Sequence, residues 1–279
     1  MDNKPPNITL IDDTVWVIDQ PIGMAQYDFR FEDHFVCKHP YQLDSEITAI
    51  ARMGAANDYA KRYEKMENWG IKLIHTPEEY DLTSYLPNWY PLIEKFTPKS
   101  IWYEKPPSVK EIENEFDWPI FVKGERQTSK HSRHKSIIES PEHYLELIEI
   151  WKRDKILHWQ KMVCREFIPL EPVAKTDPDI FPKSYEFRSF WWKNSCVGIG
   201  PYWFSENYKL DTRHEEEVIK IGSEVAELLN VKFLVIDIAY TKNGEWIVIE
   251  CNDGQDSGYA GNNPRFLWNN ILNIEKEEL

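Results

Sequence analysis

Two carboxylates and one amide occur at a spacing that suits a divalent cation. Strand-like runs flank Asn243-Gly244, and this dipeptide is a strong signal for a β-hairpin. With a two-residue turn at that point, Asp237 lies directly opposite Glu250, and Asn252 follows on the same face. Directly opposed acids repel one another unless a cation lies between them. The pattern predicts an Mg²⁺ site formed by Asp237, Glu250 and Asn252. The alternative is an edge hairpin with solvated acids.

The elements that must position these residues alternate along the chain. Expected strands cover residues 8–18, 34–38, 71–75, 101–103, 118–123, 159–168, 185–192, 196–200, 233–240 and 245–251. Expected helices cover residues 43–69, 108–116, 140–155, 211–229 and a last helix from Pro264. Residues 76–100 read as an irregular connection with a short helix. Strands that alternate with helices, together with two antiparallel hairpins, favour an α/β front part followed by an α+β body.

Composition excludes several classes of protein. The 279 residues carry 33 Lys+Arg against 47 Asp+Glu, a formal net charge of −14. This acidity argues against a protein whose main role is nucleic-acid binding, because phosphate backbones select basic surfaces. The N-terminal residues do not resemble a secretory signal, no apolar run is long enough to span a membrane, and the four cysteines form no C-x-x-C pair. We expect a reduced, cytoplasmic protein without membrane partners.

One loop is basic although the chain is acidic. Residues 123–135 contain five Lys or Arg and one acid. Its cations Arg126, Lys130, Arg133 and Lys135 are candidates for a lid over a triphosphate, and a solvated basic loop is the alternative. Lys135 leads into the strand-like residues 136–138, which makes it the favoured second phosphate ligand. Glycine is scarce, with 11 residues in the chain, so the usual glycine-rich nucleotide loops are absent.

Four segments, taken in order, resemble the ATP-grasp superfamily, as a divergent branch of its ATP-dependent carboxylate–amine ligases. The hairpin of Asp237, Glu250 and Asn252 resembles the family's Mg²⁺ site. Residues 118–123 look like the strand that ends in a phosphate-binding lysine, residues 163–168 like the strand and hinge that meet adenine, and residues 186–188 like an acidic-x-Arg step. The resemblance covers roughly residues 100–270. The loop after Lys123 departs from it, because that loop is charged here and not rich in glycine.

The resemblance implies roles for further residues. Lys123 and Arg188 would stabilise the transferring group, and the nucleotide would be bound by Lys123, Lys135, Glu166, Phe167, Ile168, Glu171 and Arg188, with Glu171 as a candidate for the ribose hydroxyls. Each assignment has an ordinary alternative. Lys123 could be a strand-end lysine, Arg188 could pair with Glu186, and Glu166 could pair with Arg165 or Lys161.

The resemblance also implies an organisation and an activity. Residues 1–100 would form a small α/β domain of the kind that precedes an ATP-grasp body. Residues 101–279 would form the ATP-grasp fold, with subdomains at about 101–158 and 159–279. The implied activity is an ATP- and Mg²⁺-dependent ligase that joins a carboxylate to an amine through an acyl-phosphate, on a small molecule, a peptide or a protein. A kinase on the same scaffold, a non-catalytic nucleotide-binding module and a nucleic-acid protein that uses the basic loop remain alternatives.

Overall fold

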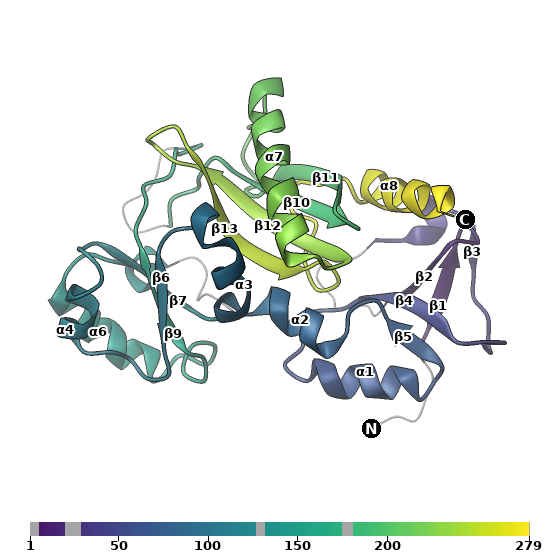
Figure 1. Ribbon diagram of the computed structural model, residues 1–279, viewed down its shortest axis with the longest axis horizontal. Helices are drawn as coiled ribbons and strands as arrows, with labels where there is room; N and C mark the ends of the chain where they lie inside the picture. Colours follow the sequence, from purple (N-terminus) through teal and green to yellow (C-terminus); the bar gives the residue numbers. More distant parts are fainter. Residues whose placement is uncertain (1–5, 20–28, 127–131, 175–180, 279) are drawn as a thin grey trace.

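The computed structural model describes residues 6–19, 29–126, 132–174 and 181–278. Three sheets organise these residues. Figure 1 shows the N-terminal sheet at the right, the sheet of β6, β9 and β7 at the left, and the sheet that contains β10, β12 and β13 between them. Within the described ranges, no helix is both long enough and apolar enough to cross a membrane.

The N-terminal sheet has the strand order β3-β1-β2-β4-β5. Its strands β2, β4 and β5 pair in parallel, and the β1–β2 hairpin and β3 add antiparallel edges. This mixed arrangement fits the expected α/β front part. Its elements are β1 (Ile8–Ile11), β2 (Val15–Asp19), η1 (Phe31–Asp33), β3 (Cys37–Lys38), β4 (Ile47–Arg52), α1 (Tyr59–Glu67) and β5 (Ile71–Leu73).

The long helix expected over residues 43–69 is wrong. Its first part is the strand β4, and only residues of α1 are helical. β4 lies between two parallel neighbours, and its last four residues are buried. A strand covered on both faces carries a continuous apolar run, which sequence periodicity does not separate from a helix. The predicted stop at Gly70 is confirmed, since this residue has φ +72°.

Residues 76–100 are more regular than expected. They contain α2 (Pro77–Ser84), α3 (Leu86–Ile93) and η2 (Glu94–Phe96). Thr76 forms a complete capping box with Glu79, which fixes the start of α2. Tyr80 and Trp89 are each only 1% exposed, so these two aromatic residues of the segment serve packing.

The second sheet has the order β6-β9-β7-β8, with antiparallel pairing throughout. The predicted capping box of Ser108 and Glu111 is present and begins α4. Ser140 caps α6 as predicted. Lys135 does not lead directly into a strand, because it lies in the one-turn helix α5. The elements are β6 (Ser100–Tyr103), α4 (Val109–Glu113), β7 (Ile120–Gly124), α5 (Arg133–Ser136), β8 (Ile137–Ile138), α6 (Pro141–Trp151) and β9 (Met162–Glu166).

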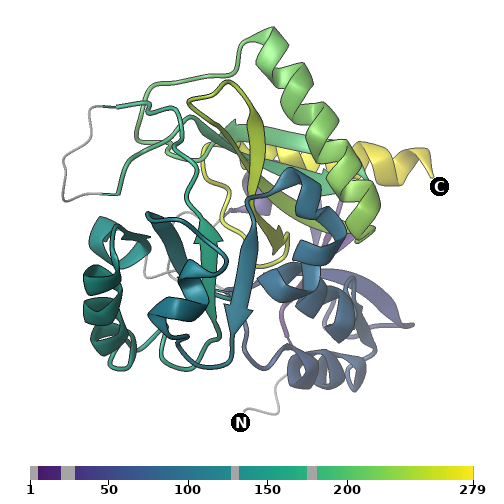
Figure 2. The same cartoon turned by 60° about the vertical axis from the view of Figure 1, so that its left-hand side comes forward.

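The third sheet has the order β11-β10-β12-β13 and carries the predicted metal ligands. Asp211 caps α7, and Asn263 with Pro264 begins α8, close to the expected positions. Figure 2 shows the strands of the second sheet beside the β12–β13 hairpin. The elements are β10 (Glu186–Trp192), β11 (Ser195–Pro201), α7 (Thr212–Leu229), β12 (Phe233–Tyr240), β13 (Trp246–Asp253) and α8 (Pro264–Glu277).

The β12–β13 hairpin reaches the predicted pairing by a different route. Its turn is longer than two residues, since the Thr241 N–H donates to the Glu245 carbonyl (2.8 Å) and Gly244 has φ +85°. A bulge on β13 then leaves Ile249 without an opposite residue and restores the register. Asp237 therefore still lies opposite Glu250, as predicted.

Candidate functional site

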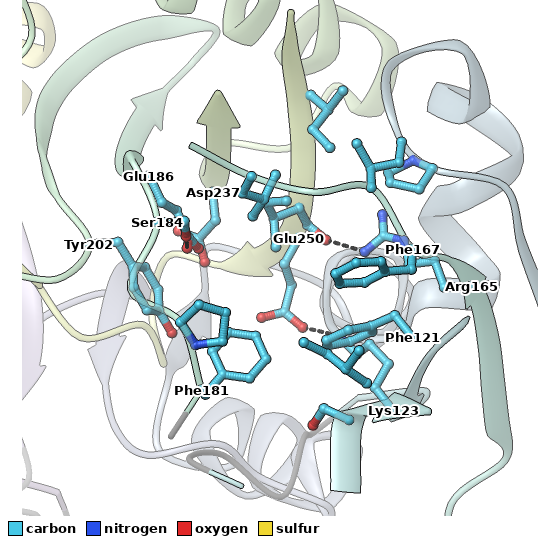
Figure 3. A pocket seen from close by; sticks show the side chains of 18 of the residues that line it. Phe121, Lys123, Arg165, Phe167, Phe181, Ser184, Glu186, Tyr202, Asp237 and Glu250 are labelled. Carbon is cyan, nitrogen blue, oxygen red and sulfur yellow. Dashed lines mark hydrogen bonds and ion pairs between the residues drawn. The ribbon is translucent and has the colours of Figure 1, made fainter. Parts of the chain in front are cut away.

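A pocket lies between the second and third sheets. One wall is the hinge after β9, formed by Glu166, Phe167 and Ile168. Apolar side chains continue this wall, among them Phe121, Ile137, Leu170, Ile247 and Ile249. Charged groups also line the pocket, namely Lys123, Arg165, Lys183, Glu186, Asp237 and Glu250. Figure 3 shows Phe121, Phe167, Lys123 and Arg165 on one side, and Asp237, Glu186 and Ser184 on the other.

Each of the two opposed acids has a protein cation as its partner. The Arg188 guanidinium forks onto Asp237, with Nε–Oδ1 at 2.8 Å and Nη2–Oδ2 at 2.7 Å. Lys123 Nζ donates to Glu250 Oε1, as the dashed line in Figure 3 indicates. These two pairs balance the charge of the hairpin. The cations that separate the acids in this structure therefore come from the chain itself.

The donor set on β12 and β13 suits a hard divalent cation. Asp237 and Glu250 are opposite each other, and the Asn252 amide lies 3.5 Å from Glu250 Oε2. Asp237 is 1% exposed, so the site is shielded from water. Among the described residues there is no group of three or more His, Cys, Asp or Glu arranged to hold a metal. The predicted Mg²⁺ site thus depends on the Asn252 amide as its third ligand.

Lys123 reaches the pocket because of the alternation of β7. Phe121 and Lys123 are two residues apart, point to the same face and both line the pocket. Lys123 is 4% exposed. A buried ammonium needs an anionic partner, and Glu250 supplies it here. Lys123 is therefore more than a strand-end lysine that extends into solvent.

Arg188 lies behind the pocket wall. Its guanidinium contacts Asp237, the Gly258 carbonyl (Nη1–O 3.0 Å) and the face of Tyr202 at 5.1 Å. Burial lowers the pKa of Arg188, but the Asp237 carboxylate outweighs this and the pKa is raised. The pairing with Glu186 that we kept as an alternative does not occupy these contacts. Arg188 belongs to the metal-ligand hairpin, and the structure does not place it among the residues that line the pocket.

Arg165 is a site residue that the sequence did not single out. Its Nη1 donates to the Ile249 carbonyl (2.7 Å) and its Nη2 to Thr97 Oγ1, so it joins β9 to β13. Burial lowers its pKa to about 10, and Glu250 opposes this effect. The neighbouring Glu166 is exposed, and Lys161 pairs with Glu104 at 3.0 Å. The alternative pairings of Glu166 with Arg165 or Lys161 therefore do not account for it.

The basic loop divides into parts with different surroundings. Lys135 Nζ lies 3.1 Å from Asp154 Oδ2 and does not line the pocket, whereas the next residues, Ser136 and Ile137, do. Arg133 pairs with Glu139 (2.7 Å), and Lys130 lies outside the described residues.

Arg126 is not an exposed cation of a lid. It is 7% exposed, and its Nη1 donates to Asn57 Oδ1 (2.8 Å) and the Ala56 carbonyl (2.9 Å). Its Nη2 also contacts the Tyr80 hydroxyl and lies 3.5 Å from Asp256. Arg126 therefore joins the end of β7 to the N-terminal sheet and to the loop after β13. No local pattern indicates this role, because the partners are far away along the chain.

Two glutamates compete for the ribose role. Glu171 is exposed and does not line the pocket, although Leu170 and Pro172 on either side of it do. Glu186, at the start of β10, is 6% exposed, lines the pocket and accepts a hydrogen bond from Ser184 Oγ (2.9 Å). From the sequence, Glu186 was expected only as the acid of the acidic-x-Arg step.

One known sequence family spans this whole site. The profile of an ATP-grasp domain, described as family 3 of its clade, matches residues 90–271, well over half of the chain. The chain belongs to this ATP-grasp family. The match includes every candidate site residue and begins after the N-terminal sheet. No match was found among curated protein sequences.

Solved structures share the ATP-grasp fold at low sequence identity. The D-alanine–D-alanine ligase of Bacillus anthracis complexed with ATP has a TM-score of 0.58 and 16% identity, over 83% of this chain and 81% of that one. The VanG D-Ala:D-Ser ligase of Enterococcus faecalis has a TM-score of 0.57 and 16% identity, over 82% and 71%. A RimK domain ATP-grasp protein of Sphaerobacter thermophilus has a TM-score of 0.55 and 13% identity, over 82% and 78%. These likenesses extend beyond the family match and include the N-terminal part, which confirms the expected fold class.

Proposed function

We propose that this ATP-grasp protein is an ATP- and Mg²⁺-dependent ligase that joins a carboxylate to an amine. The observation that carries the proposal is the composition of one pocket. An apolar hinge wall lies at Glu166–Ile168, and a charged group of Lys123, Asp237 and Glu250 lines the same pocket. An adenine ring needs the first, and a metal-bound triphosphate needs the second. The solved ligases with this fold support the choice of reaction class.

The charges of the site suit a metal–triphosphate complex. Lys123 and Arg188 supply two positive charges, and Asp237 and Glu250 supply two negative charges. Mg²⁺ would be held by Asp237, Glu250 and Asn252, where it would neutralise developing negative charge on phosphate oxygens. Lys123 and Arg188 would stabilise the group in transfer, which is chiefly an electrostatic task.

The reaction that we propose needs no protein nucleophile. The substrate carboxylate attacks the γ-phosphorus of ATP and displaces ADP, which gives an acyl-phosphate. The amine then attacks the acyl carbon, the carbon–oxygen bond to phosphate breaks, and inorganic phosphate leaves. Burial raises the pKa of Cys164 to about 12 and that of Cys251 also rises, so neither thiol is poised as a nucleophile.

We assign the ribose hydroxyls to Glu186 in preference to Glu171. The carboxylate of Glu186 is buried and lines the pocket, and it keeps a fixed orientation through Ser184. A hydroxyl pair bound there would replace water with two charge-assisted hydrogen bonds. Glu171 would have to turn its exposed side chain around Leu170 or Pro172 to reach the same space.

Isothermal titration and product analysis test the ligase proposal together. The protein with Mg²⁺ is titrated with ATP, and the release of phosphate is then followed with amino acids and short peptides as donor and acceptor. A ligase gives ADP, phosphate and an amide in equal amounts. A stable phosphorylated product would assign a kinase, and saturable ATP binding without turnover on any substrate pair would support a binding module.

The variant Glu186→Gln, with Glu171→Gln as its matched control, tests the ribose assignment. We expect the first change to weaken ATP binding by about tenfold, since one charge-assisted bond is worth about 1.5 kcal/mol. The control is expected to leave the affinity unchanged. The reverse result would return the ribose role to Glu171.

A further inference from the structure

Arg188 joins two functional elements through one guanidinium. Its Nε and Nη2 bind both carboxylate oxygens of Asp237, at 2.8 and 2.7 Å. Its Nη1 donates to the carbonyl of Gly258, at 3.0 Å, in the loop that follows Asn252. Arg188 is 9% exposed and Asp237 is 1% exposed, so both contacts are shielded from solvent. A shift of this side chain at one end must therefore affect the other end.

The loop of residues 254–258 is held almost entirely through its backbone carbonyls. Arg52, on β4, donates from Nη1 to the Gly254 carbonyl (2.6 Å) and the Gln255 carbonyl (3.1 Å), and from Nη2 to the Ser257 carbonyl (2.9 Å). Arg188 takes the next carbonyl, that of Gly258. Two arginines from different sheets thus fix four carbonyls of one short segment. Of the two, only Arg188 also contacts a candidate metal ligand among the residues that the structure describes.

A divalent cation at Asp237 changes the balance at Arg188. The cation and the guanidinium compete for the same carboxylate oxygens and repel one another at close range. A free cation would leave Arg188 and Lys123 buried without their acidic partners, which is costly. A triphosphate that arrives with the cation offers new oxygen acceptors to both residues. The exchange is therefore favourable only when cation and nucleotide arrive together.

We propose that Arg188 is a positioning residue that couples the nucleotide–metal site to the loop of residues 254–258. Without nucleotide, it holds Asp237 and Gly258 at the same time. When a metal–nucleotide complex binds, the cation takes Asp237, the guanidinium turns to the phosphates, and the Gly258 carbonyl is released. The loop then becomes free to adjust next to the reacting phosphate. This inference rests on the proposed function.

The first arm of the test measures metal binding without nucleotide. Mn²⁺ is titrated into the full chain, and free Mn²⁺ is read by electron paramagnetic resonance. We expect the Arg188→Gln variant to bind Mn²⁺ alone about tenfold or more tightly than the wild type, because one repelling charge is gone. Arg188→Lys, which keeps the charge, is expected to bind Mn²⁺ as weakly as the wild type. Equal Mn²⁺ affinity in the wild type and Arg188→Gln would overturn the proposed exchange.

The second arm measures the loop by hydrogen exchange, with peptides from α6 as the internal reference. In the wild type, we expect peptides that contain residues 254–258 to exchange faster with Mg²⁺–ADP than without it. In Arg188→Lys, a single ammonium cannot hold both partners, so the same peptides should exchange fast in either condition. Unchanged or slower exchange in the wild type would overturn the coupling. Failure of Mg²⁺–ADP to bind at all, measured by calorimetry, would count against the proposed function instead.

Discussion

Replacement of Asp256 by Asn is expected to change how the stability of the protein depends on pH. The Asp256 side chain is 10% exposed and lies at the junction of three parts of the chain. Its Oδ2 accepts a hydrogen bond from the Tyr80 hydroxyl (2.7 Å) and lies 3.5 Å from Arg126 Nη2. Burial and the charge of Asp253 raise its pKa from 3.8 to about 7, while Tyr80, Arg126 and Arg52 oppose the rise.

The sign and size of the effect follow from this difference. The folded state binds the Asp256 proton more tightly than the unfolded chain, so protonation favours folding. This contribution is fully present below pH 3.8 and is lost as the pH rises toward 7. At about 1.4 kcal/mol per pKa unit, the full contribution is up to about 4 kcal/mol. Between pH 5 and pH 8, the part that is lost is about 3 kcal/mol. Asn keeps the neutral shape and has no proton to lose.

Urea unfolding at pH 5, 6, 7 and 8 measures this difference. We expect the stability of Asp256→Asn relative to the wild type to increase with pH over this range, by up to about 3 kcal/mol. Asp58→Asn is the matched control, because the Asp58 side chain is 54% exposed and pairs with Arg62 on the surface. A stability difference between Asp256→Asn and the wild type that stays constant from pH 5 to pH 8 would refute the reasoning.

Three further changes have specific expected outcomes. Gly200→Ala is expected to destabilise the protein by about 3 kcal/mol in urea unfolding, since a Cβ there would lie 2.4 Å from the backbone nitrogen of Asn262; an unchanged midpoint would contradict this packing. Thr76→Ala removes the capping box with Glu79 and should cost about 1 kcal/mol, whereas Thr76→Ser should restore most of it. Lys123→Met should weaken Mg²⁺–ATP binding by about tenfold or more in calorimetry, with the fold intact by circular dichroism. Tight binding by this variant would remove Lys123 from the phosphate site.

Local patterns in the sequence predicted much of the site. Asp237 and Glu250 were placed opposite each other from an Asn-Gly turn signal and a period of two. The pairing holds although the turn is longer, because the bulge at Ile249 compensates. Lys123 was found because it ends a short apolar strand. Such predictions succeed where one strand or one hairpin decides which side chains meet.

Contacts between distant segments could not be predicted in the same way. Arg126 appeared to belong to a charged, solvated loop, and its partners near Asn57 and Asp256 come from two other regions of the fold. β4 was read as part of a helix, because only its burial between two parallel strands shows that it is a strand. Glu186 emerged as a pocket residue only once the segment before β10 brought Ser184 beside it.

Calorimetric titration of ATP in the presence of Mg²⁺ tests the central claim most directly, with the wild type and a variant that combines Asp237→Ala with Glu250→Ala. We predict one saturable ATP site in the wild type, and binding about tenfold weaker or more in the variant, because the variant lacks both carboxylates of the metal site. Circular dichroism of both chains establishes that the comparison is between folded proteins. No ATP binding by the wild type, or equal binding by the two chains, would contradict the proposed site.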